Sequence, residues 1–162
     1  MNRREFLMTS ASAGVLLAFG GSAFGKSRER LRVGLIGTGL RGQVQLDELR
    51  KRDVVNVAAI CDIEKFMLDT ALKQFEKAGK RKPRIYTGSD EAWREMIAKA
   101  RLDAVIIATP WEWHAPQAIA AMKAKVAVGC EVVAGITLED HWQVLRVQQE
   151  TGTPYMLLEN VC

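Results

Sequence analysis

The chain of 162 residues has few of the residue types that build metal centres and disulfide frameworks. It contains two histidines and three cysteines, Cys61, Cys130 and Cys162, and no His/Cys cluster has metal-ligand spacing. An odd number of cysteines does not make a disulfide framework. Cys61 and Cys130 both lie near the ends of predicted strands, where cysteine usually acts as a small buried hydrophobe. We therefore expect no metal site.

The sequence also has little excess of charge of either sign. Its formal net charge is +4, from 23 basic and 19 acidic residues. The densest basic run, Lys80 to Arg84, contains Pro83 and lies between a predicted helix and a predicted strand. We interpret this run as a solvated loop, and we expect no nucleic-acid partner.

The amino terminus has the features of an export signal. Arg3 and Arg4 precede an apolar run over about residues 11–24, and Ala23 and Gly25 supply the small residues of a cleavage site. The run is too short and too rich in glycine and serine for a comfortable membrane span. We expect a twin-arginine signal over residues 1–25, export to the periplasm and no stable membrane anchor. An ordinary Sec signal or an uncleaved anchor is the alternative.

Residues 26–162 alternate between strand and helix patterns. Strands are expected at 31–37, 54–61, 84–88, 103–110, 126–131 and 155–160, with helices at 40–51, 63–79, around 92–97, around 115–124 and from 137 to about 150. Strands separated by single helices indicate right-handed crossovers and a parallel sheet. The sequence therefore predicts an α/β fold with a doubly wound parallel sheet, as in the Rossmann dinucleotide-binding domain.

Polar residues predict where two of the helices begin. Ser89 or Asp90 is placed to cap the helix around 92–97. Thr137, with Asp140 three residues later, has the pattern of a capping box.

A glycine-rich loop follows the first predicted strand and opens the first predicted helix. Its glycines, Gly37, Gly39 and Gly42, have the spacing of a dinucleotide-binding loop. Gly37 permits the tight turn, Gly39 lets a pyrophosphate approach the backbone, and Gly42 lets the helix pack close to the sheet. The helix end then offers free N–H groups to the phosphates.

An acidic residue stands about twenty positions beyond the loop, at the end of the second predicted strand. This residue, Asp62, can accept hydrogen bonds from ribose hydroxyls and would repel a 2′-phosphate. The sequence therefore favours NAD over NADP, although Arg41 or Lys65 would overturn that preference by binding a 2′-phosphate. The alternative is a glycine turn beside an unrelated surface aspartate.

Longer segments of the sequence resemble a known family. These segments are "GLIGTGLRG" (34–42), "CD" (61–62), "YTGSDEAW" (86–93), "ATPWEWHAPQAI" (108–119), "CEVVAGITLEDHW" (130–142) and "MLLEN" (156–160). Together they resemble the Gfo/Idh/MocA oxidoreductase superfamily. Within it, they are most similar to glycoside hydrolase family 109, the NAD-dependent α-N-acetylgalactosaminidases.

The resemblance implies a set of NAD contacts in addition to the three glycines. Leu40 and Arg41 would contact the phosphates, and Asp62 the adenosine ribose. After the fourth strand the contacts would be Thr109 and Pro110, followed on the nicotinamide side by Trp111, Glu112, Trp113 and His114. Glu131 and Val132 would follow the fifth strand, and Asn160 the sixth. Alternatives remain for several of them. The two tryptophans would also suit the core, His114 would also cap a helix, and Glu131 would also suit the surface.

The resemblance also implies a mechanism in which NAD takes a hydride from C3 of the sugar and later returns it. Between these steps the C2 proton and the C1 substituent leave and water adds. Many relatives carry a catalytic lysine after the glutamate that corresponds to Glu131, but this chain has Val132, and valine cannot move a proton. Val133 departs from the proline common in family 109. We therefore assign no catalytic residue.

Members of the family are far longer than this chain and carry a second domain that contacts the sugar. We expect a fragment, residues 26–162, that binds NAD and has little or no glycosidase activity until a second domain supplies the carbohydrate site. An NAD-dependent sugar dehydrogenase and a non-catalytic NAD-binding module are the alternatives. The oligomeric state stays open, and a homo-oligomer is compatible with the sequence.

Overall fold

Six parallel strands form one sheet in the computed structural model, which describes residues 30–159. The strands are β1 (Leu31–Ile36), β2 (Val55–Cys61), β3 (Arg84–Tyr86), β4 (Ala104–Ile107), β5 (Ala127–Glu131) and β6 (Tyr155–Leu158). Their order across the sheet is β3-β2-β1-β4-β5-β6. This is the order of the doubly wound dinucleotide-binding fold, so the predicted fold class is confirmed. The expected signal over 1–25 and Asn160 lie outside the described residues.

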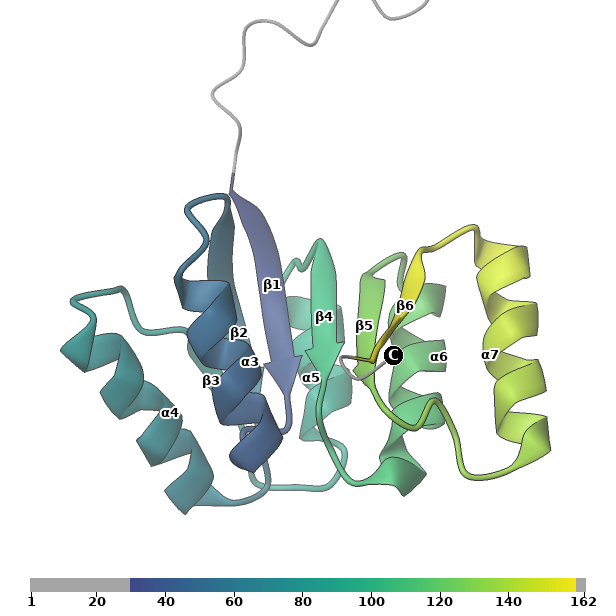
Figure 1. Cartoon of the computed structure of the whole chain (residues 1–162), viewed down its shortest axis with the longest axis horizontal. Helices are drawn as coiled ribbons and strands as arrows, with labels where there is room; N and C mark the ends of the chain where they lie inside the picture. Colours follow the sequence, from purple (N-terminus) through teal and green to yellow (C-terminus); the bar gives the residue numbers. More distant parts are fainter. Residues whose placement is uncertain (1–29, 160–162) are drawn as a thin grey trace, which may run out of the picture.

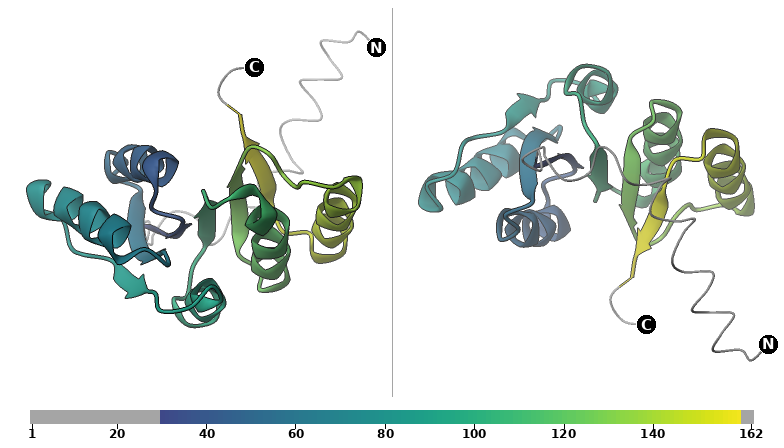
Figure 2. Two further views of the ribbon diagram at one scale, coloured as in Figure 1. Left: turned by 90° about the horizontal axis from the view of Figure 1, so that it is seen from below. Right: turned by 90° about the horizontal axis from the view of Figure 1, so that it is seen from above.

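Helices cover both faces of this sheet. They are α3 (Leu40–Arg50), α4 (Lys65–Lys77), α5 (Ala92–Lys99), α6 (His114–Lys123) and α7 (Leu138–Thr151). Figure 2 shows α3 and α4 on one face and α5, α6 and α7 on the other. The carboxyl ends of the strands point to the lower edge of the molecule in Figure 1, where α3 and α6 begin. Within residues 30–159, no helix is both long enough and apolar enough to cross a membrane.

The strands are buried on both sides, which explains their nearly continuous apolar sequences. In β1, Leu35 packs in a cluster with Leu46 of α3 and Phe75 of α4, whereas its neighbour Ile36 packs with residues of α5 and α6 on the other face. Each of these side chains is at most 2% exposed. Burial of one such side chain stabilises the fold by about 1.5–3 kcal/mol, so two cores hold the sheet and fix the loops at its carboxyl edge.

Strand β4 is shorter than the sequence predicted. It ends at Ile107 rather than at residue 110, and a 3₁₀ turn, Trp111–Trp113, precedes α6. Pro110 lacks a backbone N–H and is fixed at φ −56°, so it cannot continue the ladder of hydrogen bonds. The shortening places the segment after β4 at the edge of the sheet rather than within it.

The predicted cap of α5 is wrong. Glu91 occupies the cap position and no side chain caps the helix. Backbone hydrogen bonds take the place of the cap, because Ala92 N donates to Ser89 O (3.1 Å) and Arg94 N donates to Glu91 O (2.9 Å). The side chains of Ser89 and Asp90 therefore do not hold the start of this helix.

The predicted capping box of α7 is confirmed. Asp140 N donates to Thr137 Oγ1 (3.1 Å), and Thr137 N donates to Asp140 Oδ2 (2.8 Å). The backbone and side-chain hydrogen bonds of Thr137 lower the pKa of the Asp140 carboxyl. A helix end satisfied in this way starts at a defined residue.

Some apolar residues in and beside the helices do not face the core. Val44 is exposed on α3, because Gly42 and Leu46 face inward and a residue midway between them points away. Ile63 and Phe66 are also exposed at the start of α4. The buried stripe of α4 runs instead through Leu68, Ala71 and Phe75.

Candidate cofactor-binding site

The glycine loop connects β1 to α3 at the carboxyl edge of the sheet. Gly37 has φ +86°, and a Cβ built on it would lie 2.5 Å from Ala108 O in the loop after β4. A Cβ on Gly42 would lie 2.0 Å from Gly37 O, so α3 packs directly on the loop. A Cβ on Gly39, in contrast, would meet no atom within 4 Å. The geometry thus agrees with the prediction for each glycine: Gly37 forms the tight turn, Gly42 allows the close contact of α3, and Gly39 leaves an open cradle.

The amino end of α3 faces this cradle. Gly39 occupies its cap position, no side chain caps it and its first turn carries no acidic residue. The first N–H groups of a helix lack partners within the helix, and the helix dipole makes this end positive. An open cradle beside uncapped N–H groups fits a pyrophosphate, the anionic centre of a dinucleotide.

Asp62 connects the loops that follow β1 and β2. Its Oδ2 accepts hydrogen bonds from Thr38 N (2.6 Å) and Thr38 Oγ1 (2.9 Å), and its Oδ1 accepts one from Glu64 N (2.9 Å). An ionised carboxylate accepts about four hydrogen bonds, so this partly exposed group keeps capacity for a ribose hydroxyl. Thr38 is fully buried and was absent from the predicted site, although it stands inside the glycine loop.

A cavity of about 410 Å³ opens beside Asp62. Its walls are mostly apolar and include Ile36, Cys61, Ile63, Met67, Trp93, Pro110 and Trp113. Trp93 and Trp113 meet edge to face, with ring centroids 6.4 Å apart. Burial raises the pKa of the Cys61 thiol to about 12, so the thiol stays neutral. The size and the flat aromatic walls fit the adenine end of NAD.

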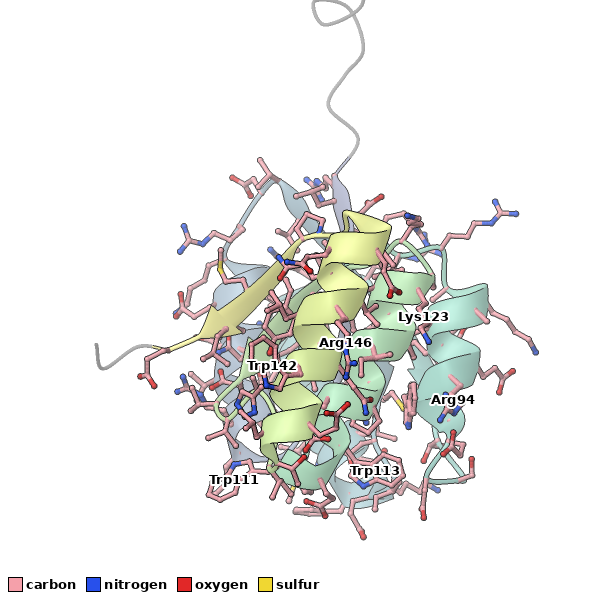
Figure 3. The ribbon with its side chains drawn as sticks, turned by 90° about the vertical axis from the view of Figure 1, so that its right-hand side faces the viewer. Arg94, Trp111, Trp113, Lys123, Trp142 and Arg146 are labelled. Carbon is pink, nitrogen blue, oxygen red and sulfur yellow. The ribbon has the colours of Figure 1, made fainter. Side chains whose placement is uncertain are left out.

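The structure separates the residues of the Trp-Glu-Trp-His segment. Trp113 lines the cavity, whereas Trp111 is 60% exposed and does not line it. Figure 3 shows the two rings at the lower end of the molecule, pointing to opposite sides. Glu112 is exposed between them and His114 is buried. The structure therefore does not bring these four side chains together. Their contacts with nicotinamide stay a prediction, and for Trp113 its place in the cavity at Asp62 favours the adenine end instead.

His114 joins two loops at the carboxyl edge of the sheet. Its side chain is 1% exposed, with Nε2 2.8 Å from Thr109 O and Nδ1 2.5 Å from Val133 O. The imidazole thus holds the loop after β4 against the loop after β5. Nearby, Thr109 Oγ1 donates to Oε1 of the buried Gln117 (2.8 Å), which fixes the threonine beside the cavity.

We expect His114→Ala to lower the free energy of unfolding by about 2–4 kcal/mol, because it leaves a cavity and removes the partner of two backbone oxygens. Urea unfolding followed by circular dichroism measures this change. The matched control is His141→Ala, because His141 is exposed on α7 and should change stability by about 0.5 kcal/mol or less. Equal effects of the two substitutions would contradict the role of His114.

Glu131 ends β5 and is buried, so the alternative that it is a surface acid is wrong. It is 5% exposed, and its Oε1 forms an ion pair with Arg41 Nε (2.9 Å) and accepts a hydrogen bond from Gln45 Nε2. Val132 and Val133 follow it and are 36% and 40% exposed. The predicted contact of Arg41 with phosphate stays a prediction, because in this structure the guanidinium contacts Glu131. Gln45 was absent from the predicted site.

The described residues 30–159 contain no group of three or more His, Cys, Asp or Glu side chains arranged to hold a metal ion.

Comparison with known proteins places this geometry in a family. Residues 31–158 match the sequence model of the Gfo/Idh/MocA oxidoreductase family, with its NAD-binding Rossmann fold. A glycosyl hydrolase family 109 protein of Stenotrophomonas maltophilia (strain K279a) is 54% identical over 165 aligned residues, which cover 100% of this chain and 36% of that protein. An alpha-N-acetylgalactosaminidase of Tannerella forsythia is 44% identical over 139 residues, 85% of this chain and 30% of that protein. The chain thus spans about a third of the length of these relatives.

A solved structure has the same fold. Scyllo-inositol dehydrogenase from Lactobacillus casei, with bound NAD(H) and scyllo-inositol, superposes with a TM-score of 0.69 at 20% sequence identity. The similarity covers 80% of this chain and 36% of the dehydrogenase chain.

Proposed function

Because the chain belongs to the Gfo/Idh/MocA oxidoreductase family and forms its NAD-binding Rossmann domain, we propose that it is the NAD-binding part of a family 109 glycosidase acting on α-N-acetylgalactosaminides. The observation that carries this proposal is the 54% identity over the whole chain to a glycosyl hydrolase family 109 protein. The relative named alpha-N-acetylgalactosaminidase supports the substrate class. Export through the twin-arginine signal over 1–25, ahead of the domain at 26–162, belongs to the same proposal.

The residues of this chain position the cofactor. The backbone at Gly39 and the start of α3 bind the pyrophosphate, Asp62 accepts a hydrogen bond from a hydroxyl of the adenosine ribose, and the cavity at Trp93 and Trp113 holds adenine. When bound, NAD supplies a hydride acceptor and donor, so that oxidation and re-reduction of one sugar carbon cancel within a turnover.

The carboxyl end of β5 supports the glycosidase over a dehydrogenase that uses a lysine at this position. Val132 and Val133 follow Glu131 there, and neither side chain can carry a proton. These two positions therefore contribute position and shape to the site, and another residue of the proposed enzyme carries the proton.

A chimera tests this proposal. The segment of the Tannerella forsythia relative that aligns with this chain is replaced by the corresponding residues of this chain, and the product is assayed with an aryl α-N-acetylgalactosaminide. We expect hydrolysis without net formation of NADH, and no hydrolysis by the 162-residue chain alone. Accumulation of NADH with a free sugar would show a dehydrogenase instead. A chimera that binds NAD⁺ but catalyses neither reaction would favour a non-catalytic NAD-binding module.

A further inference from the structure

Arg41, Gln45 and Glu131 form a cluster at the carboxyl edge of the sheet, between the glycine loop and the end of β5. The Glu131 side chain is 7% exposed, forms an ion pair with Arg41 and accepts a hydrogen bond from Gln45. The Arg41 side chain is 41% exposed, so the cation lies on the solvent side of the pair. The cluster therefore combines a buried anion with one partner that solvent reaches.

The fold brings these residues together from distant parts of the sequence. Alternate residues of a strand share a face, so Glu131 projects from the same face of β5 as Gly129, which lies against Ile106 of β4. This face carries α3, whose side chains at 41 and 45 are one turn apart and reach the end of β5. Arg41 belongs to the first turn of α3, the turn whose N–H groups face the glycine cradle.

In a dinucleotide-binding domain the pyrophosphate lies on this helix end and its two halves extend to either side. The cavity at Asp62 fits the adenine half, so the second ribose extends toward β4 and β5, where Glu131 stands. The Arg41–Glu131 ion pair therefore connects the start of α3, where the pyrophosphate would lie, to the end of β5, where the second ribose would lie.

On the basis of the proposed NAD site, we propose that the Arg41–Glu131 ion pair is a latch that the pyrophosphate opens. Phosphate oxygens compete with Glu131 for the guanidinium, which forms strong charge-assisted hydrogen bonds with phosphate. Glu131 then keeps the amide of Gln45 as its partner and accepts hydrogen bonds from hydroxyls of the second ribose. Gln45 is a positioning residue, because it holds the carboxylate after Arg41 has turned away.

The latch has a measurable cost. The site has two states, one with the Arg41–Glu131 pair formed and one with it broken, and a ligand shifts their equilibrium only by its difference in affinity for them. Part of the binding free energy of the phosphates is therefore used to break the pair. ADP carries the two phosphates and lacks the second ribose, so ADP binding reports this cost alone. Neutralising Glu131 should therefore strengthen ADP binding.

Calorimetric titration of the 162-residue chain with ADP tests the latch. We expect Glu131→Gln to tighten ADP binding by about fivefold, and the same substitution to change it by less than about twofold in an Arg41→Gln background. If Glu131 simply repelled the phosphates, Glu131→Gln would tighten ADP binding as much or more in the Arg41→Gln background as in the wild type. The matched control is Glu139→Gln, an exposed glutamate on α7 paired with Arg146, which should leave ADP binding unchanged.

NAD⁺ titrations separate this inference from the proposed function. Glu131→Gln should tighten NAD⁺ binding less than ADP binding, and Gln45→Leu should weaken NAD⁺ but not ADP binding. If the wild type binds NAD⁺ and Glu131→Gln leaves ADP affinity unchanged, the latch is wrong and the NAD site stands. If the wild type binds neither ligand, both proposals fail.

A measurement on the wild type follows the ion pair directly and needs a variant only to assign one resonance. The Nε–H resonance of Arg41, assigned by its loss in Arg41→Lys, should shift when ADP is added. An unchanged resonance in the ADP-bound chain would overturn the latch.

Discussion

Gly39→Ala should weaken NAD⁺ binding by roughly 100-fold, or about 2.8 kcal/mol, without lowering the stability of the fold. The backbone of Gly39 has φ −65° and ψ −165°, which alanine also adopts, and its Cβ would meet no protein atom within 4 Å. The added methyl group would instead fill the cradle that we propose for the pyrophosphate. Calorimetric titration with NAD⁺ measures the loss, and urea unfolding should give a free energy equal to that of the wild type or up to about 1 kcal/mol higher.

Gly42→Ala is the matched comparison. Its Cβ would lie 2.0 Å from Gly37 O, so this substitution must move α3 away from the loop and lower stability as well as NAD⁺ affinity. The two alanine variants thus separate a glycine needed by the ligand from a glycine needed by the fold. Wild-type affinity for NAD⁺ in Gly39→Ala would show that the pyrophosphate does not use this cradle.

Asp62→Ala should also weaken NAD⁺ binding by roughly 10- to 100-fold, because one ribose hydrogen bond to a charged acceptor contributes about 1.5–3 kcal/mol. The substitution also removes the two hydrogen bonds from Thr38 that fix the glycine loop. NADP⁺ should lose less affinity than NAD⁺, since the carboxylate no longer repels a 2′-phosphate. Parallel titrations with the two dinucleotides measure this change in preference.

Thr38→Val isolates the contribution of the loop. It removes the 2.9 Å hydroxyl contact with Asp62 Oδ2 and keeps the carboxylate available to the ribose. We expect a loss of about fivefold or less in NAD⁺ affinity and no change in the preference for NAD⁺ over NADP⁺. A loss as large as that of Asp62→Ala would assign the aspartate a role in the loop rather than at the ribose.

Much of the fold follows from local sequence patterns. Continuous apolar runs predict buried parallel strands, and the glycine loop with Asp62 predicts the edge at which the ligand binds. The errors have local causes that the apolar pattern does not record. Pro110 ends β4 early, and backbone hydrogen bonds rather than a side chain start α5. Val44 follows the apolar pattern of α3 yet faces solvent.

The site was less predictable than the fold, because its contacts join distant segments. The glycines and Asp62 lie where their spacing indicated. The contacts of Glu131 with Arg41 and Gln45 depend on α3 lying over the end of β5, which no local pattern records. For the same reason, the spacing within the Trp-Glu-Trp-His segment did not indicate that its two tryptophans point apart and that His114 is buried.

Titration of the purified 162-residue chain with NAD⁺ and, separately, with NADP⁺ tests the central claim most directly. The account predicts saturable binding of one NAD⁺ per chain and weaker binding of NADP⁺. Absence of NAD⁺ binding by a folded chain, or preference for NADP⁺, would contradict the assignment of the glycine loop and Asp62 to an NAD site.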